Sequence, residues 1–320
     1  MSQAPDYPLE LEPEDLSPYR QGTSGVDYVH SFRGPRAGLH VMINALTHGN
    51  ELCGMHVVKR LLDLNIRPVC GELTLSFANV AAYQCFGPQR LDARFLDRDF
   101  NRLWHDELLQ EDSHSIEARR AHEMLPIVRT VDRLLDLHST WHALKPFFVL
   151  PKFAKTRALA DALGYPGRQL FLPGIRHEGY HLIDYNPFRQ DDAGAVALIV
   201  ECGQHFARSS VDNAWQTAVR MLQVCGVVDL AVAADLHAAA AAPADAAIER
   251  FEIVQPVIAE SDHLEMLGSY AGFDAYPLGA CAAMDGQKPI LAPFDDAIVI
   301  APRPAPAKGK QAFAWGRRVA

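Results

Sequence analysis

The sequence predicts an α/β protein, with a sheet covered by helices on both faces and a smaller, mostly β domain after it. Short apolar runs typical of buried strands alternate with helical patterns between residues 39 and 226. Residues 236–247 are almost all Ala with one Pro, which indicates a helix end and a linker. Residues 248–320 are rich in Pro and Gly and hold only short apolar pieces, as in a β domain. We therefore expect a large α/β domain over residues 1–235, a linker over 236–247 and a small β domain over 248–320.

The individual elements follow from local patterns. Residues 39–48 form an apolar run ending in a polar turn, which predicts a buried strand, and residues 51–65 carry apolar side chains at helical spacing. An irregular arm is expected over the first ~20 residues and a long ordered loop over 80–105. Further strands are expected at 71–79, 131–139, 145–153 and 195–201, a partly helical stretch at 115–130, and a helix over 209–226 with a serine N-cap and Gly226 at its end.

Composition narrows the class of protein. The 320 residues are 49% hydrophobic and 22% charged with a net charge of −9, which is ordinary for a soluble globular protein. The sequence has no long basic run, which argues against nucleic acid as a partner, and no apolar run near the ~20 residues that span a bilayer. The acidic N-terminus does not resemble a secretory signal, and six cysteines without a C-x-x-C pair predict a cytoplasmic protein with reduced, buried thiols.

A His and a Glu lie three residues apart at the first predicted strand-to-helix turn. His48 ends the strand, Gly49 and Asn50 form the turn, and Glu51 begins the helix. Zinc accepts imidazole nitrogen and carboxylate oxygen, and ligands in open α/β sheets gather at the carboxyl ends of strands. His114 and Glu117 have the same spacing, but they lie in a polar stretch with no strand before it, so we interpret that pair as part of a solvated helix face.

A second histidine, His138, follows another predicted strand. With His48 and Glu51 it completes a two-histidine, one-glutamate set that leaves the fourth zinc position open for water, as a catalytic site requires. Strand alternation places Asp136 on the same face as His138, where it is a candidate hydrogen-bond partner of that ligand. His142, four residues further on, is a rival ligand.

Two other stretches carry reactive or charged groups. Glu201 follows a buried apolar strand, where a carboxylate is costly unless it has a role or a partner, so it is either a general base or a salt-bridged structural residue. The segment from Arg94 to Arg102 is dense in Arg and carboxylates. It is either a surface ion-pair cluster or a device in which a guanidinium polarises a carbonyl while Asn101 and Arg102 clamp a substrate carboxylate.

Taken together, the motifs HGNE, R-x₆-NR in the form DFNR, DLH and VECG resemble the succinylglutamate desuccinylase/aspartoacylase family, within the wider zinc carboxypeptidase group. The resemblance covers roughly residues 39–205 by motif. It implies a three-layer α/β/α carboxypeptidase-like core with a mixed sheet and a C-terminal β domain that shapes access to the site.

The resemblance also implies roles for single residues. His48, Glu51 and His138 match the zinc ligands, one ion per chain, and Glu201 matches the catalytic glutamate.

Four further positions match substrate-handling residues of the family. Arg94 matches the arginine that steadies the carbonyl oxyanion, and Asn101 with Arg102 matches the pair that binds a substrate carboxylate. Arg189 lies near the place of a second substrate arginine. The family's usual Asp-Leu-Asn-Arg is Asp-Phe-Asn-Arg here, an apolar exchange.

The expected activity is that of a zinc-dependent amidohydrolase. Its partner would be a small anionic N-acylated substrate, cleaved by zinc-activated water with Glu201 as general base and acid. We expect no nucleic acid and no membrane as partner, and the sequence is compatible with a homo-oligomer. The alternatives are a metallocarboxypeptidase acting on short peptides and a non-catalytic zinc-binding protein on the same fold.

Overall fold

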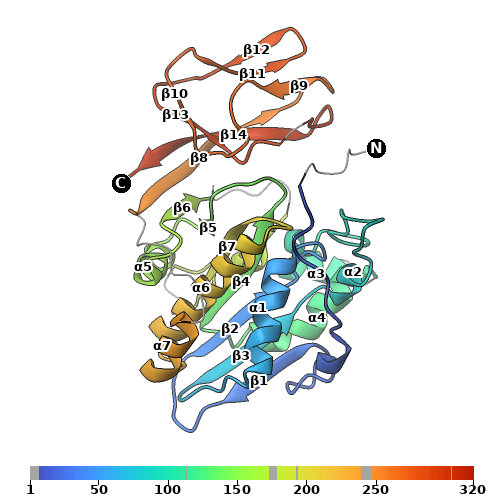
Figure 1. Cartoon of the computed structure of the whole chain (residues 1–320), viewed down its shortest axis with the longest axis vertical. Helices are drawn as coiled ribbons and strands as arrows, with labels where there is room; N and C mark the ends of the chain where they lie inside the picture. The colour runs from blue at the N-terminus through green and yellow to red at the C-terminus, as the bar shows by residue number, and fades with distance from the viewer. Residues whose placement is uncertain (1–6, 112–113, 173–178, 192–193, 239–246, 304) are drawn as a thin grey trace.

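The computed structural model describes residues 7–111, 114–172, 179–191, 194–238, 247–303 and 305–320. It confirms the expected architecture, a mixed α/β core with a smaller β part at the C-terminal end (Figure 1). The large sheet contains β1 (Val29–Arg33), β2 (His40–Ala45), β3 (Glu72–Phe77), β4 (Arg133–Thr140), β5 (Phe147–Leu150), β6 (Arg168–Phe171), β7 (Val196–Gln204), β8 (Glu249–Ile258), β10 (Ala275–Tyr276), β13 (Ala297–Ile300) and β14 (Gln311–Val319). The small sheet contains β9 (Leu264–Met266), β11 (Cys281–Asp285) and β12 (Lys288–Leu291).

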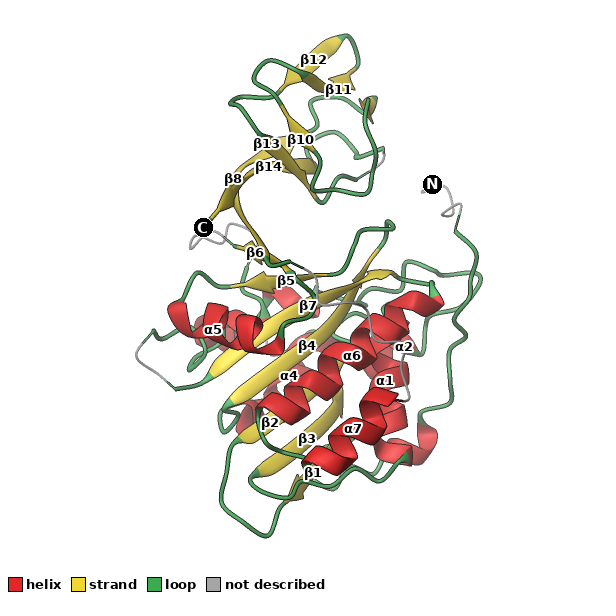
Figure 2. Ribbon diagram, turned by 60° about the vertical axis from the view of Figure 1, so that its left-hand side comes forward, coloured by secondary structure: helices red, strands yellow, loops and turns green. Residues whose placement is uncertain are grey.

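Helices cover the core sheet on both faces. The α-helices are α1 (Leu52–Asp63), α2 (Val80–Tyr83), α3 (Asp106–Glu111), α4 (Ile116–Val128), α5 (Ala154–Leu163), α6 (Arg208–Val224) and α7 (Leu230–Ala238), and the 3₁₀ turns are η1 (Ser17–Tyr19), η2 (Phe100–Arg102) and η3 (Leu182–Asp184). Figure 2 shows α1, α6 and α7 on one face, with α4 behind the sheet. Successive strand residues point to opposite faces, so Val41 and Ile43 pack with α1 and α6 while Met42 packs with α4.

The order of the strands brings the predicted site together. The large sheet runs β1-β3-β2-β4-β7-β5-β6-β8-β14-β13-β10, and β2, β3, β4 and β7 are parallel neighbours. Their carboxyl ends therefore lie at one edge, with His138 opposite Glu201 in the register of β4 and β7. β1 pairs antiparallel with β3, and β5 antiparallel with β7, so the sheet is mixed as expected.

One detail of α6 corrects the expectation of a serine N-cap. The helix begins at Arg208, with Ala207 as its N-cap residue. The Ser210 hydroxyl donates to the Ala207 carbonyl oxygen instead of accepting from a free amide. The first amide, that of Arg208, donates to the Glu10 carboxylate of the N-terminal arm at 2.8 Å, so a distant segment caps this helix. Gly226, with a φ of 66°, follows its end as expected.

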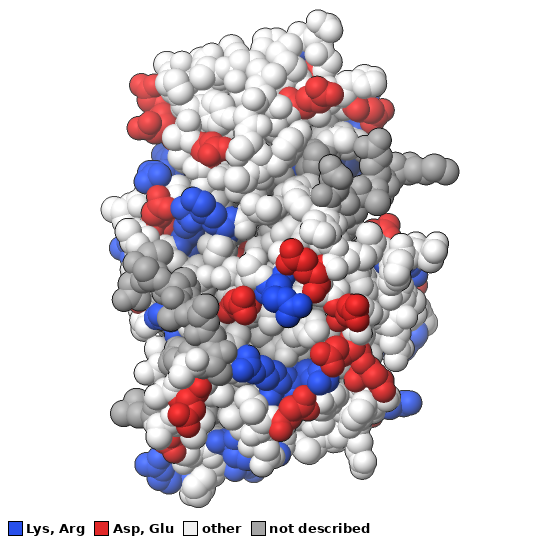
Figure 3. Space-filling view, viewed as in Figure 1, with Lys and Arg blue, Asp and Glu red and all other residues white. Residues whose placement is uncertain are grey.

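The thiols are only partly buried. All six cysteines are free, and Cys53 and Cys202 are buried, but Cys85 is exposed. The expectation of uniformly buried thiols is therefore wrong, because Cys85 lies in an exposed turn directly after α2. Within the described ranges, none of the helices is both long and apolar enough to cross a membrane. Basic and acidic side chains are interspersed on the face shown in Figure 3.

The C-terminal β part has its own apolar core and joins the large sheet through its backbone. Phe313 and Trp315 pack in that core, while β8 pairs in parallel with β6. The Phe273 ring lies 5.1 Å from the Phe147 ring of β5, centroid to centroid. Most of the predicted 236–247 linker lies outside the described residues, and the domain boundaries at 235 and 248 stay a prediction.

Candidate metal centre

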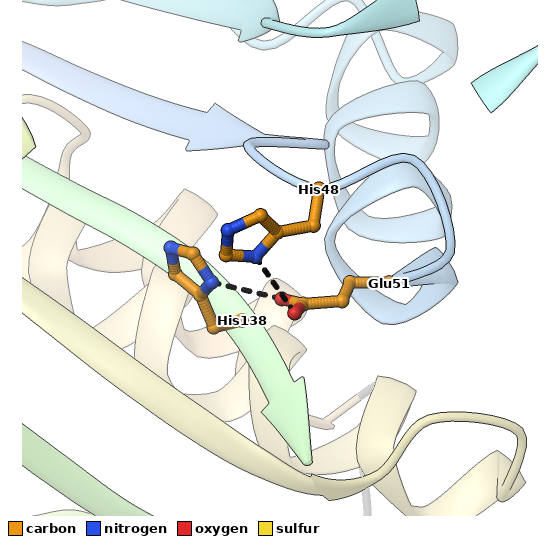
Figure 4. A group of neighbouring side chains, drawn as sticks. All are labelled: His48, Glu51 and His138. Atoms are coloured by element: carbon orange, nitrogen blue, oxygen red, sulfur yellow. Dashed lines mark hydrogen bonds and ion pairs between the residues drawn. The ribbon is translucent and has the colours of Figure 1, made fainter. Parts of the chain in front are cut away.

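Three buried side chains from two segments meet at the carboxyl edge of the sheet. His48, Glu51 and His138 each offer a ligand atom, and these atoms lie within 4.8 Å of one another. The two carboxylate oxygens of Glu51 lie 2.8 Å from His48 Nδ1 and 2.8 Å from His138 Nδ1 (Figure 4). Each of the three residues is 2% exposed. The predicted ligands therefore converge, and two imidazole nitrogens with one carboxylate are a donor set that zinc accepts.

The turn between β2 and α1 explains how His48 and Glu51 reach one point. Glu51 is the N-cap residue of α1, so its side chain projects beyond the helix end. A Cβ atom at Gly49 would lie 2.4 Å from the backbone of Ala82, so the turn admits only glycine here. The Gly49 amide donates to the Arg94 carbonyl oxygen at 3.0 Å, which ties this turn to the loop that carries Arg94.

A buried polar network orients His138. Asp136 is fully buried, and its Oδ2 lies 2.8 Å from His138 Nε2. Its Oδ1 accepts hydrogen bonds from Asn44 Nδ2 at 2.8 Å and from Thr47 Oγ1 at 2.7 Å. Because an ionised carboxylate only accepts hydrogen bonds, Asp136 favours the tautomer in which Nε2 of His138 carries the proton and donates it, which leaves Nδ1 as the nitrogen for a metal. Asp136 is thus the hydrogen-bond partner of His138 that was expected from the sequence.

Asp99 orients His48 as Asp136 orients His138, although the sequence pattern assigned Asp99 no role. Its Oδ1 lies 3.1 Å from His48 Nε2, and its Oδ2 accepts from Arg94 Nε at 3.2 Å. Burial opposes ionisation, but the hydrogen bond and charge of His48, together with Arg94 and Arg102, hold the pKa of Asp99 well below its usual range. Its place five residues after Arg94 and two before Asn101 was the available signal.

Glu201 supplies a carboxylate beside the cluster. Its Oε2 is buried and has no hydrogen-bond partner within the described ranges. Burial, with the neighbouring Glu51 charge, raises the pKa of Glu201 to about 8, against the lowering effect of His138. A divalent cation nearby would favour its ionised form. The structure shows no salt bridge to this carboxylate in the described part of the chain, which disfavours the structural reading of Glu201.

The predicted substrate-binding residues lie on the loop next to the cluster. Arg94 NH1 donates to Glu51 Oε1 at 3.3 Å, so this guanidinium borders the candidate metal position. Asn101 is buried, and its Oδ1 accepts from the Leu182 amide at 2.8 Å. Arg102 follows it and bonds the Asn101 carbonyl oxygen at 2.8 Å.

Two other predicted residues lie apart from the cluster. Arg189 is exposed, and its guanidinium lies 5.0 Å from the centre of the Tyr180 ring. Among the described residues it makes no contact with His48, Glu51 or His138, and its role stays a prediction. The rival ligand His142 lies outside the cluster, with its Nδ1 3.4 Å from the Tyr7 hydroxyl.

Of the second His-Glu pair, His114 and Glu117, only the histidine lies on a solvated face. His114 is exposed, but Glu117 has no exposed surface and accepts four hydrogen bonds from two neighbouring segments. The expectation for Glu117 is therefore wrong. Three of the four donors to Glu117 are backbone amides of residues 96–98, and a residue pattern does not reveal such partners.

His205 is a further buried group close to the centre. Its Nδ1 lies 2.7 Å from the Ser139 hydroxyl, and the Ser139 amide donates to Glu51 Oε2 at 3.1 Å. Burial is the largest cause that lowers the pKa of His205, to about 4, and the imidazole is therefore neutral at neutral pH.

A three-layer α/β/α core with this cluster at the carboxyl ends of its central strands defines the zinc-carboxypeptidase-like class of folds. The family model described as succinylglutamate desuccinylase/aspartoacylase catalytic domain matches residues 37–225, more than half of the chain. The chain therefore belongs to the succinylglutamate desuccinylase/aspartoacylase family, as its motifs indicated.

Solved structures share the fold at low identity. A succinylglutamate desuccinylase from Vibrio cholerae is 18% identical with a TM-score of 0.68, over 92% of this chain and 86% of that one. An aspartoacylase family protein from Mesorhizobium loti is 21% identical with a TM-score of 0.63, over 91% and 89%. A product-bound ectoine utilization protein from Ruegeria pomeroyi is 16% identical with a TM-score of 0.64, over 90% and 87%. No curated protein matches the sequence.

Proposed function

We propose that this protein is a zinc-dependent amidohydrolase that removes the acyl group from a small N-acyl amino acid or related carboxylate. The observation that carries the proposal is Glu201 Oε2, which is buried beside the His48, Glu51 and His138 cluster and has no hydrogen-bond partner among the described residues. A buried carboxylate oxygen without a partner destabilises a fold, so its presence at a candidate metal centre favours a chemical role.

The chain supplies the proton transfers through Glu201. A zinc ion held by the cluster would lower the pKa of a water molecule toward about 7 and polarise the acyl carbonyl. Glu201 takes a proton from the attacking water and returns it to the leaving nitrogen. Arg94, which borders Glu51, faces the oxygen on which negative charge develops.

Binding of the substrate falls to the segment after Arg94. The Asn101 amide and the Arg102 guanidinium follow each other in η2, next to Asp99. A planar guanidinium beside an amide donor is well suited to grip a carboxylate, and this contact orients the scissile bond rather than polarising it. The proposed substrate is therefore anionic and small, and we assign it no membrane or nucleic-acid partner.

Metal analysis together with a hydrolysis panel tests the proposal. The panel consists of N-acetyl, N-succinyl and N-formyl amino acids, with short peptides that carry a free C-terminus as the competing class. We expect about one zinc ion per chain and hydrolysis of at least one N-acyl amino acid. The Glu201→Gln variant should keep its zinc and lose turnover by about 10²–10⁴-fold.

Each other outcome rejects the proposal in a distinct way. Preference for peptides would assign a metallocarboxypeptidase, and bound zinc without hydrolysis of any panel member would assign a non-catalytic metal protein. Full activity in Glu201→Gln would remove Glu201 from the reaction.

A further inference from the structure

The buried carboxylate of Glu117 binds the backbone of the loop at residues 96–98, and the proposed mechanism gives Glu117 no role. Glu117 lies in the first turn of α4 and has no exposed surface. Its Oε1 accepts from the Leu96 amide at 2.7 Å and from Asn79 Nδ2 at 3.2 Å. Its Oε2 accepts from the Asp97 and Arg98 amides, both at 3.1 Å. Three consecutive backbone amides therefore converge on one carboxylate.

The clamp is reciprocal. Asp97 Oδ2 accepts from the Ile116 amide at 2.8 Å, one residue before Glu117. The helix start thus binds the loop, and the loop binds the helix start. The Ser115 hydroxyl caps the same helix by accepting from the Ala118 amide at 3.1 Å, so the Glu117 carboxylate is left for the loop.

The clamped residues lie between the groups that border the candidate metal centre. Arg94 precedes them and Asp99 follows directly, and these two side chains bond each other and reach Glu51 and His48. η2, with the proposed carboxylate-binding pair, begins one residue after Asp99. Only residues 95–98 separate Arg94 from Asp99, and the amides of three of these four residues bind Glu117. A shift of this backbone therefore displaces both side chains.

We propose that Glu117 is a positioning residue of the active site, which fixes the backbone of residues 96–98 and so aligns Arg94, Asp99 and Arg102 with the metal centre. This inference rests on the proposed function for its kinetic consequence, but the clamp itself is testable without activity. Glu117 touches neither the metal ligands nor the substrate, and it acts through backbone amides.

Amide hydrogen exchange tests the clamp in the full-length, zinc-loaded protein. In Glu117→Gln an amide nitrogen takes the place of one acceptor oxygen, so residues 96–98 should exchange about 10–100-fold faster while β2 and β4 keep their rates. Glu123→Gln is the matched control, because Glu123 lies on the same helix with an exposed side chain. Unchanged exchange at 96–98 overturns the proposal. If Glu117→Gln does not fold, Asp97→Ala loosens the same loop from an exposed position.

Kinetics then separates positioning from mere loss of folded protein. The probes are the most rapidly hydrolysed N-acyl amino acid of the panel and its carboxamide, which lacks the negative charge. In Glu117→Gln, misalignment of Arg102 should lower kcat/KM for the N-acyl amino acid more than kcat/KM for its carboxamide. The ratio of the first value to the second should fall about 10-fold or more, while the zinc content stays unchanged. A merely structural Glu117 would lower both values by the same factor and leave the ratio intact, which overturns the proposal. Wild-type protein inactive on the whole panel refutes the proposed function instead, and hydrogen exchange still decides the clamp.

Discussion

Replacing Asp136 by Asn should weaken metal binding through the tautomer of His138. The carboxylate accepts from Asn44, Thr47 and His138, all within 2.8 Å. In Asp136→Asn one oxygen can still accept from Asn44 and Thr47, but an amide nitrogen that only donates then faces His138 Nε2. That contact favours the tautomer with the proton on Nδ1, the nitrogen which should bind the metal.

The magnitude follows from the loss of this one orienting contact. Hydrogen-bond partners of metal-binding histidines contribute about 10–100-fold to metal affinity. This corresponds to about 1.4–2.7 kcal/mol of zinc-binding free energy. The effect should reach the upper half of that range, because Asp136 is fully buried and water cannot replace it.

Competition titration with a chelator measures the zinc dissociation constant of both proteins. Asp132→Asn serves as the control, because Asp132 lies just before the other end of β4, where its side chain accepts from the His40 amide at 2.8 Å. We expect the control to keep wild-type zinc affinity. An Asp136→Asn protein that folds and binds zinc as tightly as wild type would refute the argument that Asp136 selects the tautomer.

Three further outcomes are expected. Chelation should lower the free energy of unfolding by about 4 kcal/mol relative to protein at a free zinc concentration a thousand times its dissociation constant; a thermal melt that zinc does not shift would contradict a resident metal. Arg102→Lys should raise KM for a carboxylate substrate about 10–100-fold with a smaller change in kcat, because lysine cannot form two parallel hydrogen bonds; an unaltered KM would place the carboxylate elsewhere. Burial lowers the pKa of His205 to about 4 in the folded protein, against 6.5 for an exposed histidine. As the pH falls, the unfolded state therefore takes up the proton first. Between pH 7 and pH 5 in metal-free protein, wild type should therefore lose about 2 kcal/mol more stability than His205→Gln, as chemical denaturation would show, and parallel pH profiles would rule this out.

The convergence of His48, Glu51 and His138 was predictable because it depends on local geometry and strand order. A strand, a glycine turn and a helix start place His48 and Glu51 together, and His138 lies near the end of a second strand at the same edge of the sheet. Parallel neighbours share their carboxyl edge, so β2 and β4 needed only to be adjacent.

What the sequence could not show were contacts that backbone groups make over long separations. Glu117 meets amides about twenty residues earlier, and the first amide of α6 meets Glu10 almost two hundred residues earlier. A residue pattern reveals apolar faces and turns, but it does not reveal which carboxylate a free amide will find. Asp99 was overlooked because its side-chain partner His48 lies fifty-one positions away in the sequence.

The parallel pairing of β6 with β8 has a practical consequence for shortening the chain. A protein that stopped before residue 248 would keep the ligand-bearing strands, but it would leave Arg168–Phe171 as an open border with unpaired amides and carbonyls. Such a border is a template for association with other chains. By pairing with this strand, β8 protects the core from self-association.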